Sequence, residues 1–168
     1  MPVFTATFSA VAVSAAQDVF EIVAHASSRV RVRKIFIGQY SDAGDAAAEM
    51  PSVQVIRGYT VSGSGGSTVT PANLQPWSRA AVSVVEANNT TVANTGTAEV
   101  LISETFNVQA GWLWAPGQMD PRRGASYEDE YIYLEAGSRL VVRITAPADA
   151  VTMNGTLVFE EIGKQPTS

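Results

Sequence analysis

Apolar and polar residues alternate along most of this chain. Residues 3–60 and 98–162 consist of short runs in which every second residue is apolar, and clusters of Gly, Pro, Asn and Asp separate these runs. Such alternation is typical of strands in antiparallel sheets, and almost no stretch keeps the period of a helix. The pattern therefore predicts an all-β chain.

About nine or ten short strands are expected from this alternation. They cover residues 3–13, 19–25, 29–40, 52–61, 80–87, 98–108, 111–114, 127–134, 139–145 and 152–162. Two packed sheets of about four or five strands each would hold them, and we expect a jelly-roll-like antiparallel β-sandwich of roughly 8–10 strands. The chain has 168 residues, so we expect a single domain over residues 1–163 and a flexible tail at 164–168.

The strand expected at 29–40 contains the main cluster of basic residues. Arg29, Arg31 and Arg33 share one face of this strand. Ile35 and Ile37 continue the same face as apolar residues, which indicates that the strand becomes covered midway or contains a β-bulge. The arginines are then either solvated or paired with Glu, or they form a contact stripe for an acidic partner. A net charge of −5 and the lack of interleaved aromatic residues argue against nucleic acid as that partner.

The segment 62–67 has the sequence Ser-Gly-Ser-Gly-Gly-Ser. This composition predicts a flexible surface loop, and its deletion is expected to leave folding intact. The segment lacks the Lys-Ser/Thr ending and the following helix of a phosphate-binding loop.

Few residues of the chain suit catalysis. His25 is the only histidine and there is no cysteine, so no catalytic triad, thiolate chemistry or disulfide framework is predicted. We expect His25 to lie at a strand end or on the surface. Glycoside hydrolysis would need a carboxylate pair, whereas the acidic run is more typical of a solvated edge strand. The carboxylates considered are Glu104, Glu128, Asp129, Glu130 and Glu135.

Metal and cofactor sites are not predicted either. Asp42, Asp45 and Glu49 place hard oxygen ligands close together, but they lack the alternate-residue spacing of a calcium loop. We therefore expect no catalytic residue, no cofactor and no metal, and we expect that the protein is not an enzyme. No run approaches the length of a membrane span, so no membrane partner is expected.

Two pairs of aromatic residues have the spacing of one strand face. Trp112 and Trp114 form the first pair, and Tyr131 and Tyr133 form the second. Three uses remain open for them: packing in the core, a buried contact between subunits, or a platform for a sugar ring.

Several turn and strand sequences resemble those of a group of tailed-bacteriophage virion proteins. They lie at 65–71, 106–112, 140–143, 146–150 and 155–162. The resemblance implies a jelly-roll domain built into a phage particle, and it brings no enzymatic residues with it.

The resemblance, the low charge and the single compact domain together suggest a capsid decoration (cement) protein. Such a protein would be made in the host cytoplasm and would assemble on the phage head, favoured as a homotrimer, over junctions between major capsid protein subunits. Trp112, Trp114, Arg29, Arg31 and Arg33 are the candidate contact residues. The alternative is a tail- or fibre-associated β-sandwich module that binds host glycans.

Overall fold

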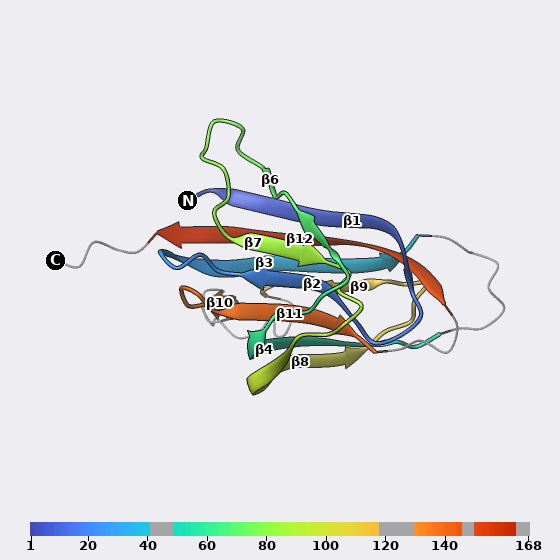
Figure 1. The fold of residues 1–168 in the computed structure, drawn as a ribbon. Helices are drawn as coiled ribbons and strands as arrows, with labels where there is room; N and C mark the ends of the chain where they lie inside the picture. Colours follow the sequence, from blue (N-terminus) through green and yellow to red (C-terminus); the bar gives the residue numbers. More distant parts are fainter. Residues whose placement is uncertain (41–48, 118–129, 146–149, 164–168) are drawn as a thin grey trace.

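A computed structural model of the chain describes residues 1–40, 49–117, 130–145 and 150–163. Two six-stranded antiparallel sheets pack face to face (Figure 1). The first, called the β1 sheet, contains β1 (Val3–Val13), β3 (Ser28–Gln39), β6 (Ala72–Asn73), β9 (Trp112–Trp114), β10 (Ile132–Leu134) and β12 (Val151–Gly163). The second, called the β2 sheet, contains β2 (Gln17–Val23), β4 (Ser52–Val61), β5 (Ser67–Val69), β7 (Val84–Ala87), β8 (Asn94–Thr105) and β11 (Arg139–Ile144).

The strand order is that of a jelly roll. The β1 sheet has the order β10-β3-β12-β1-β6, with β9 also paired to β3, and the β2 sheet has the order β5-β7-β2-β11-β4-β8. The chain therefore alternates between the sheets from β1 to β4, while β12 lies between β1 and β3 and β11 lies between β2 and β4. This nesting of Greek keys defines the jelly roll, so the predicted fold is confirmed.

Three short strands form an insertion between β4 and β8. β5 and β7 extend the β2 sheet beyond β2, and β6 extends the β1 sheet beyond β1. All three lie at the same edge of the sandwich, opposite the edge formed by β8, β9 and β10. The sequence pattern did not predict β5 and β6, because strands of two or three residues are too short to show alternation.

Other predicted strand bounds agree unevenly with the structure. The strands at 3–13 and 52–61 have the predicted bounds. The strand expected at 80–87 begins only at Val84. Of the strand expected at 127–134, only Ile132–Leu134 is observed, and residues 127–129 lie outside the described residues. β8 begins at Asn94, earlier than predicted, because Thr95 and Gly96 have φ values of 61° and 92° that fit a bulged ladder instead of a turn.

The β-bulge expected in β3 is present. Val30 and Val32 are buried before it, and Ile35 and Ile37 are buried after it, so the inward-facing parity changes. The pairing of β3 with β12 shifts register at this point, between Lys34 and Val32. Arg33 is the one extra residue on β3, so a bulge and not a change in cover accounts for the change in parity.

The core lies between the two sheets and contains most of the buried apolar side chains. Phe8 of β1 and Phe20 of β2 meet across the interface with ring centroids 5.1 Å apart. Gly155 of β12 leaves room for this pair, because a Cβ there would lie 2.5 Å from the Phe8 ring. No helix within the described ranges is long and apolar enough to cross a bilayer.

Candidate functional site

Two adjoining hollows lie between β8 and β10, along the edge of the sandwich opposite the insertion. The polar hollow has a volume of about 690 Å³, and its side chains include Arg57, Tyr59, Glu99, Tyr133, Glu135 and Arg139. The apolar hollow has a volume of about 350 Å³, and its side chains include Leu101, Ile102, Trp114, Tyr131 and Ile132. Arg57 and Tyr133 line both hollows and join them into one groove.

Opposite charges are paired inside the polar hollow. The Arg57 Nε lies 2.6 Å from a carboxylate oxygen of Glu99, and Arg57 also donates to the carbonyl of Tyr133 over 3.5 Å. Glu135 pairs at 2.8 Å with Arg29 of β3. The hollow therefore presents polar atoms of both signs with little net charge.

Two of the three tyrosines that line the groove, Tyr131 and Tyr133, interact with an arginine. The Tyr131 and Tyr133 rings meet edge to face with centroids 6.5 Å apart, and the Arg31 guanidinium lies 4.7 Å from the Tyr131 centroid. Arg31 also binds the buried carboxylate of Glu160 at 2.7 Å. Burial alone would lower the pKa of Arg31, but hydrogen bonds to Tyr133 and Glu160 raise it above the ordinary value, so the guanidinium remains charged.

The three arginines of β3 each face a glutamate of the same chain. Arg29 faces Glu135, and Arg31 and Arg33 face Glu160, with Arg33 at 3.9 Å. The prediction that this face is paired with Glu is therefore confirmed. The Arg31 side chain is only 11% exposed, which leaves little of it for an outside contact. Contact with an acidic partner stays a prediction for the more exposed Arg29 and Arg33.

The tryptophans of β9 are core residues. Trp112 and Trp114 are 5% and 6% exposed, and the Trp112 indole N–H donates to Glu104 over 2.7 Å. Of the three uses left open for this pair, packing in the core is the one observed, and in the single chain the two rings are too buried to serve as candidate contact residues or as a platform for a sugar. Strand alternation gives a shared face without saying which way it points. Only Trp114 reaches the groove, where it lines the apolar hollow together with Tyr131.

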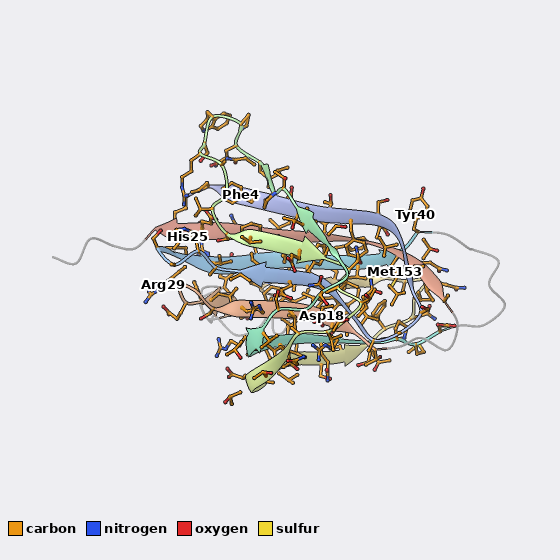
Figure 2. The ribbon with its side chains drawn as sticks, viewed as in Figure 1. Phe4, Asp18, His25, Arg29, Tyr40 and Met153 are labelled. Carbon is orange, nitrogen blue, oxygen red and sulfur yellow. The ribbon has the colours of Figure 1, made fainter. Side chains whose placement is uncertain are left out.

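The remaining sequence candidates do not converge on a site. His25 is exposed at the end of the sandwich near Arg29, with its Nδ1 2.8 Å from the Ser27 hydroxyl (Figure 2). Glu130 accepts a hydrogen bond from the Gly117 amide, and Glu49 is buried. Asp42, Asp45, Glu128 and Asp129 lie outside the described residues. Among the residues that the structure describes, no cluster of three or more His, Cys, Asp or Glu is present.

Sequence reasoning missed a buried ion pair on the outer face of the β2 sheet. Asp18 is fully buried and binds Arg143 at 2.7 Å, and it accepts the backbone amide of Ala93 over 2.6 Å. Arg143 also donates to the Ala93 carbonyl and lies 5.0 Å from the Tyr59 ring centroid. Burial alone would lower the pKa of Arg143, but Asp18 and Tyr59 raise it, so the arginine stays charged.

A second buried carboxylate, Glu21, lies on the same face. Arg139 pairs with it at 2.5 Å, and the amide of Asn89 donates to it over 3.1 Å. The Ser62 hydroxyl and the Gly63 backbone amide donate to it over 2.5 and 3.0 Å. The glycine-rich segment therefore satisfies a buried charge of β2.

These contacts correct the prediction of a flexible loop at 62–67. Besides binding Glu21, the segment pairs with residue Thr91 through a β-bridge at Ser64. Gly66 lies so close to Asn89 that a Cβ would be 2.4 Å from its side-chain oxygen. The glycines serve close packing of the backbone here, which composition alone cannot distinguish from flexibility.

Comparisons with known proteins do not identify a family for this chain. No family model matches the chain, and no curated protein matches it. A solved structure from a single-particle study of Maize Chlorotic Mottle Virus is 18% identical, covers 98% of each chain and has a TM-score of 0.26. A TM-score this low does not establish a common fold.

Proposed function

We propose that this chain is a virion structural protein, and more specifically a decoration (cement) protein of a tailed-phage head. The jelly-roll topology and the sequence resemblance support this proposal, although a fold by itself does not determine a function. The observation that carries it is an uncharged row on the outer face of the β1 sheet, which lies beyond Lys34 and the three arginines of β3 on the same face.

One row of this face crosses four strands in register. Thr7 pairs with Thr156, Thr156 with Phe36, and Phe36 with Leu113. Phe36 and Leu113 are 37% and 42% exposed, although both are large apolar side chains. Covering such a row removes apolar area from water and desolvates no charge, so it suits a contact with another protein.

A decoration protein would use this face against the capsid. A stable contact buries about 800 Å² per partner, roughly a tenth of the 8800 Å² that this chain exposes. Oligomers placed over a junction between capsid subunits, favoured as trimers, would add buried area across it. That area opposes the separation of the subunits when the packaged DNA presses outward.

Head binding tests the proposal. Heads of the encoding phage, assembled without the chain, are titrated with purified protein, and the temperature at which they release DNA is then measured. Saturable binding and a raised release temperature are expected. Phe36→Lys should weaken binding about tenfold or more, because a charge would be desolvated. Val100→Lys places the same charge on the exposed part of β8 and should leave head binding unchanged.

Two results would reject the decoration role. One is a lack of wild-type binding to heads that bind another added capsid protein normally. The other is equal binding by the Phe36→Lys and wild-type proteins, which would remove the β1 sheet face from the contact.

The polar hollow favours a second candidate function, the binding of host glycans by a tail or fibre module. Tyr59 and Tyr133 supply rings there, and the Arg57–Glu99 pair supplies donors and acceptors for hydroxyl groups. A glycan array tests it: binding should be lost in Tyr133→Ala and kept in Tyr40→Ala, whose ring lies at the other end of the sandwich (Figure 2). An array with no binding by the wild type would exclude this function for the glycans displayed.

A further inference from the structure

The insertion carries the most exposed aromatic side chain of the described residues. Trp77 is 85% exposed and Leu74 is 58% exposed, with Pro76 between them in the chain. We call residues 74–77 the finger. Figure 1 shows the connection from β6 to β7, which contains the finger, standing away from both sheets. A tryptophan this exposed is uncommon on a monomeric protein, whereas tryptophan is enriched at the centres of protein interfaces.

The finger is held in place by its own hydrogen bonds. The Asn73 side chain donates to the carbonyl of Arg79 and accepts the backbone amide of Gln75, both over 2.8 Å. The Ser78 amide donates to the Gln75 carbonyl over 2.8 Å. Arg79 in turn binds the fully buried Glu161 at 2.9 Å. Trp77 is therefore presented on an ordered base, which lowers the entropy lost when it binds.

The apolar hollow lies at the opposite edge of the same molecule. It is bordered by β8 and β10, which end the two sheets on the side away from β5 and β6. Its volume of about 350 Å³ falls within the range of small-ligand pockets, roughly 300–1,000 Å³, and accommodates an aromatic side chain. The chain thus carries an apolar projection at one edge and an apolar recess at the other.

We propose that the finger of one copy inserts Trp77 into the apolar hollow of the next copy, so that the chains join head to tail in a closed ring. This inference rests on the proposed assembly of a decoration protein as an oligomer, and it names the contact. A head-to-tail contact uses two different surfaces of each copy, and such contacts close into rings when the rotation permits.

The chemistry of the hollow fits an indole ring. Leu101 and Ile132 offer apolar contact, and Tyr131 offers an aromatic ring. A buried indole also needs an acceptor for its N–H, and Glu130 lines the hollow; its carboxylate accepts the Gly117 amide through one oxygen and keeps further acceptor capacity. The same chain already pairs an indole with a carboxylate at Trp112.

The absence of charged residues in the finger also favours insertion into an apolar hollow. Residues 74–77 are Leu, Gln, Pro and Trp, so the finger brings no charged group that would have to be desolvated. Docking along the two edges leaves the outer face of the β1 sheet uncovered, and the face proposed to contact the head stays available in the ring.

Sedimentation velocity over a concentration series tests the inference with the full chain. The wild type should form an oligomer of fixed size. Trp77→Ala, which removes the projection, and Leu101→Arg, which blocks the recess, should each weaken association about 30-fold or more, as expected for an interface hot spot. Val100→Ala, next to Leu101 but exposed, should associate like the wild type. Circular dichroism checks folding, and Ala115→Arg replaces Leu101→Arg if that variant unfolds.

Mixing the two defective variants gives the sharper result. Trp77→Ala keeps an intact recess and Leu101→Arg keeps an intact finger, so one productive contact can form between them. The mixture should therefore give dimers that cannot close into a ring, although each variant alone is monomeric at the same concentration. A contact that uses the same surface twice would not give this result.

Three outcomes would overturn the ring: a wild type that is monomeric at every concentration, full association by Trp77→Ala, or a mixture that stays monomeric. Failure of the decoration role is distinguishable from these. If the wild type is monomeric but binds phage heads saturably, the ring is rejected and the decoration role is retained. If the wild type forms a ring that does not bind heads, the decoration role is rejected and the ring is retained.

Discussion

Asp18→Ala removes the fully buried partner of an ion pair and leaves the largely buried arginine in place. Arg143 would lose the carboxylate that binds its Nε at 2.7 Å and a second nitrogen at 3.2 Å. The backbone amide of Ala93 would lose its acceptor at 2.6 Å. Asp18 is 0% exposed and the Arg143 side chain is 15% exposed, so water cannot readily replace these contacts. The substitution should therefore be strongly destabilising.

The expected magnitude follows from what stays unpaired. Removing one partner of a buried ion pair costs about 3–5 kcal/mol, because the other charge remains buried and uncompensated. Part of that cost is the unsatisfied amide, for which about 1–3 kcal/mol is usual. Arg143 keeps its bonds to the Ala93 carbonyl and the Tyr59 hydroxyl, which limit the loss. We expect a loss of about 4 kcal/mol, a large share of the roughly 5–15 kcal/mol that stabilises a typical domain.

Equilibrium unfolding in urea measures this loss, and a double variant tests its cause. In Asp18→Leu with Arg143→Met both charges are gone, so stability should recover to within about 1–2 kcal/mol of the wild type. A cost below about 1 kcal/mol for Asp18→Ala would refute the reasoning. So would a double variant that loses as much as the two single variants together, since the pair would then not be coupled.

One deletion and two substitutions, one of them with a matched control, further probe the fold. Deleting residues 62–67 should cost about 3 kcal/mol or more, because the buried Glu21 would lose two hydrogen-bond donors. An unchanged thermal midpoint would contradict these contacts. Gly96→Ala should cost more than about 2 kcal/mol, since φ is +92° and a Cβ would lie 2.4 Å from a carbonyl oxygen. Gly163→Ala, with no atom within 4 Å, is its control and should change stability by less than about 0.5 kcal/mol. Trp112→Phe should cost about 1–2 kcal/mol in urea unfolding through its lost indole donor, and wild-type stability would show that this hydrogen bond contributes nothing.

The architecture could be predicted from the sequence because alternation is a local property. β1 and β4 have the bounds that their apolar residues indicate, and the switch from arginines to isoleucines on one face of β3 indicated either a change in cover or a bulge, of which the bulge is observed. The strand order was favoured but could not be derived, since the pairing of β1 with β12 joins opposite ends of the chain. No local pattern contains that pairing.

Whether a strand face points into the core or toward solvent could not be predicted from the sequence. The spacing of Trp112 and Trp114 correctly put both rings on one face, but alternation is the same whether that face points into the core or out of it. The residue between them, Leu113, is the exposed one. Trp77, the most exposed tryptophan, lies in an irregular segment where periodicity gives no information.

Buried charges were the largest omission. Asp18 and Arg143 are 125 residues apart, and Arg31 and Glu160 are 129 apart. A charged residue in an alternating strand suggests a solvated position, which is the usual outcome. Only the tertiary structure brings each carboxylate to its arginine, so composition and spacing could not show that these residues are buried.

Taken together, the buried carboxylates show that the insertion belongs to the folding unit of the jelly roll. Glu21 binds the Gly63 amide at its start, Glu161 accepts amides that directly precede β7, and Asp18 accepts one that precedes β8. Each of these carboxylates would lose backbone donors if the insertion detached, although Asp18 and Glu21 would keep their arginine partners from β11, so the insertion and the sheets should unfold together. The finger that presents Trp77 is consequently anchored to the core of the molecule. An anchored finger loses less entropy on docking than a loose loop would, which favours Trp77 as the centre of the proposed contact between copies.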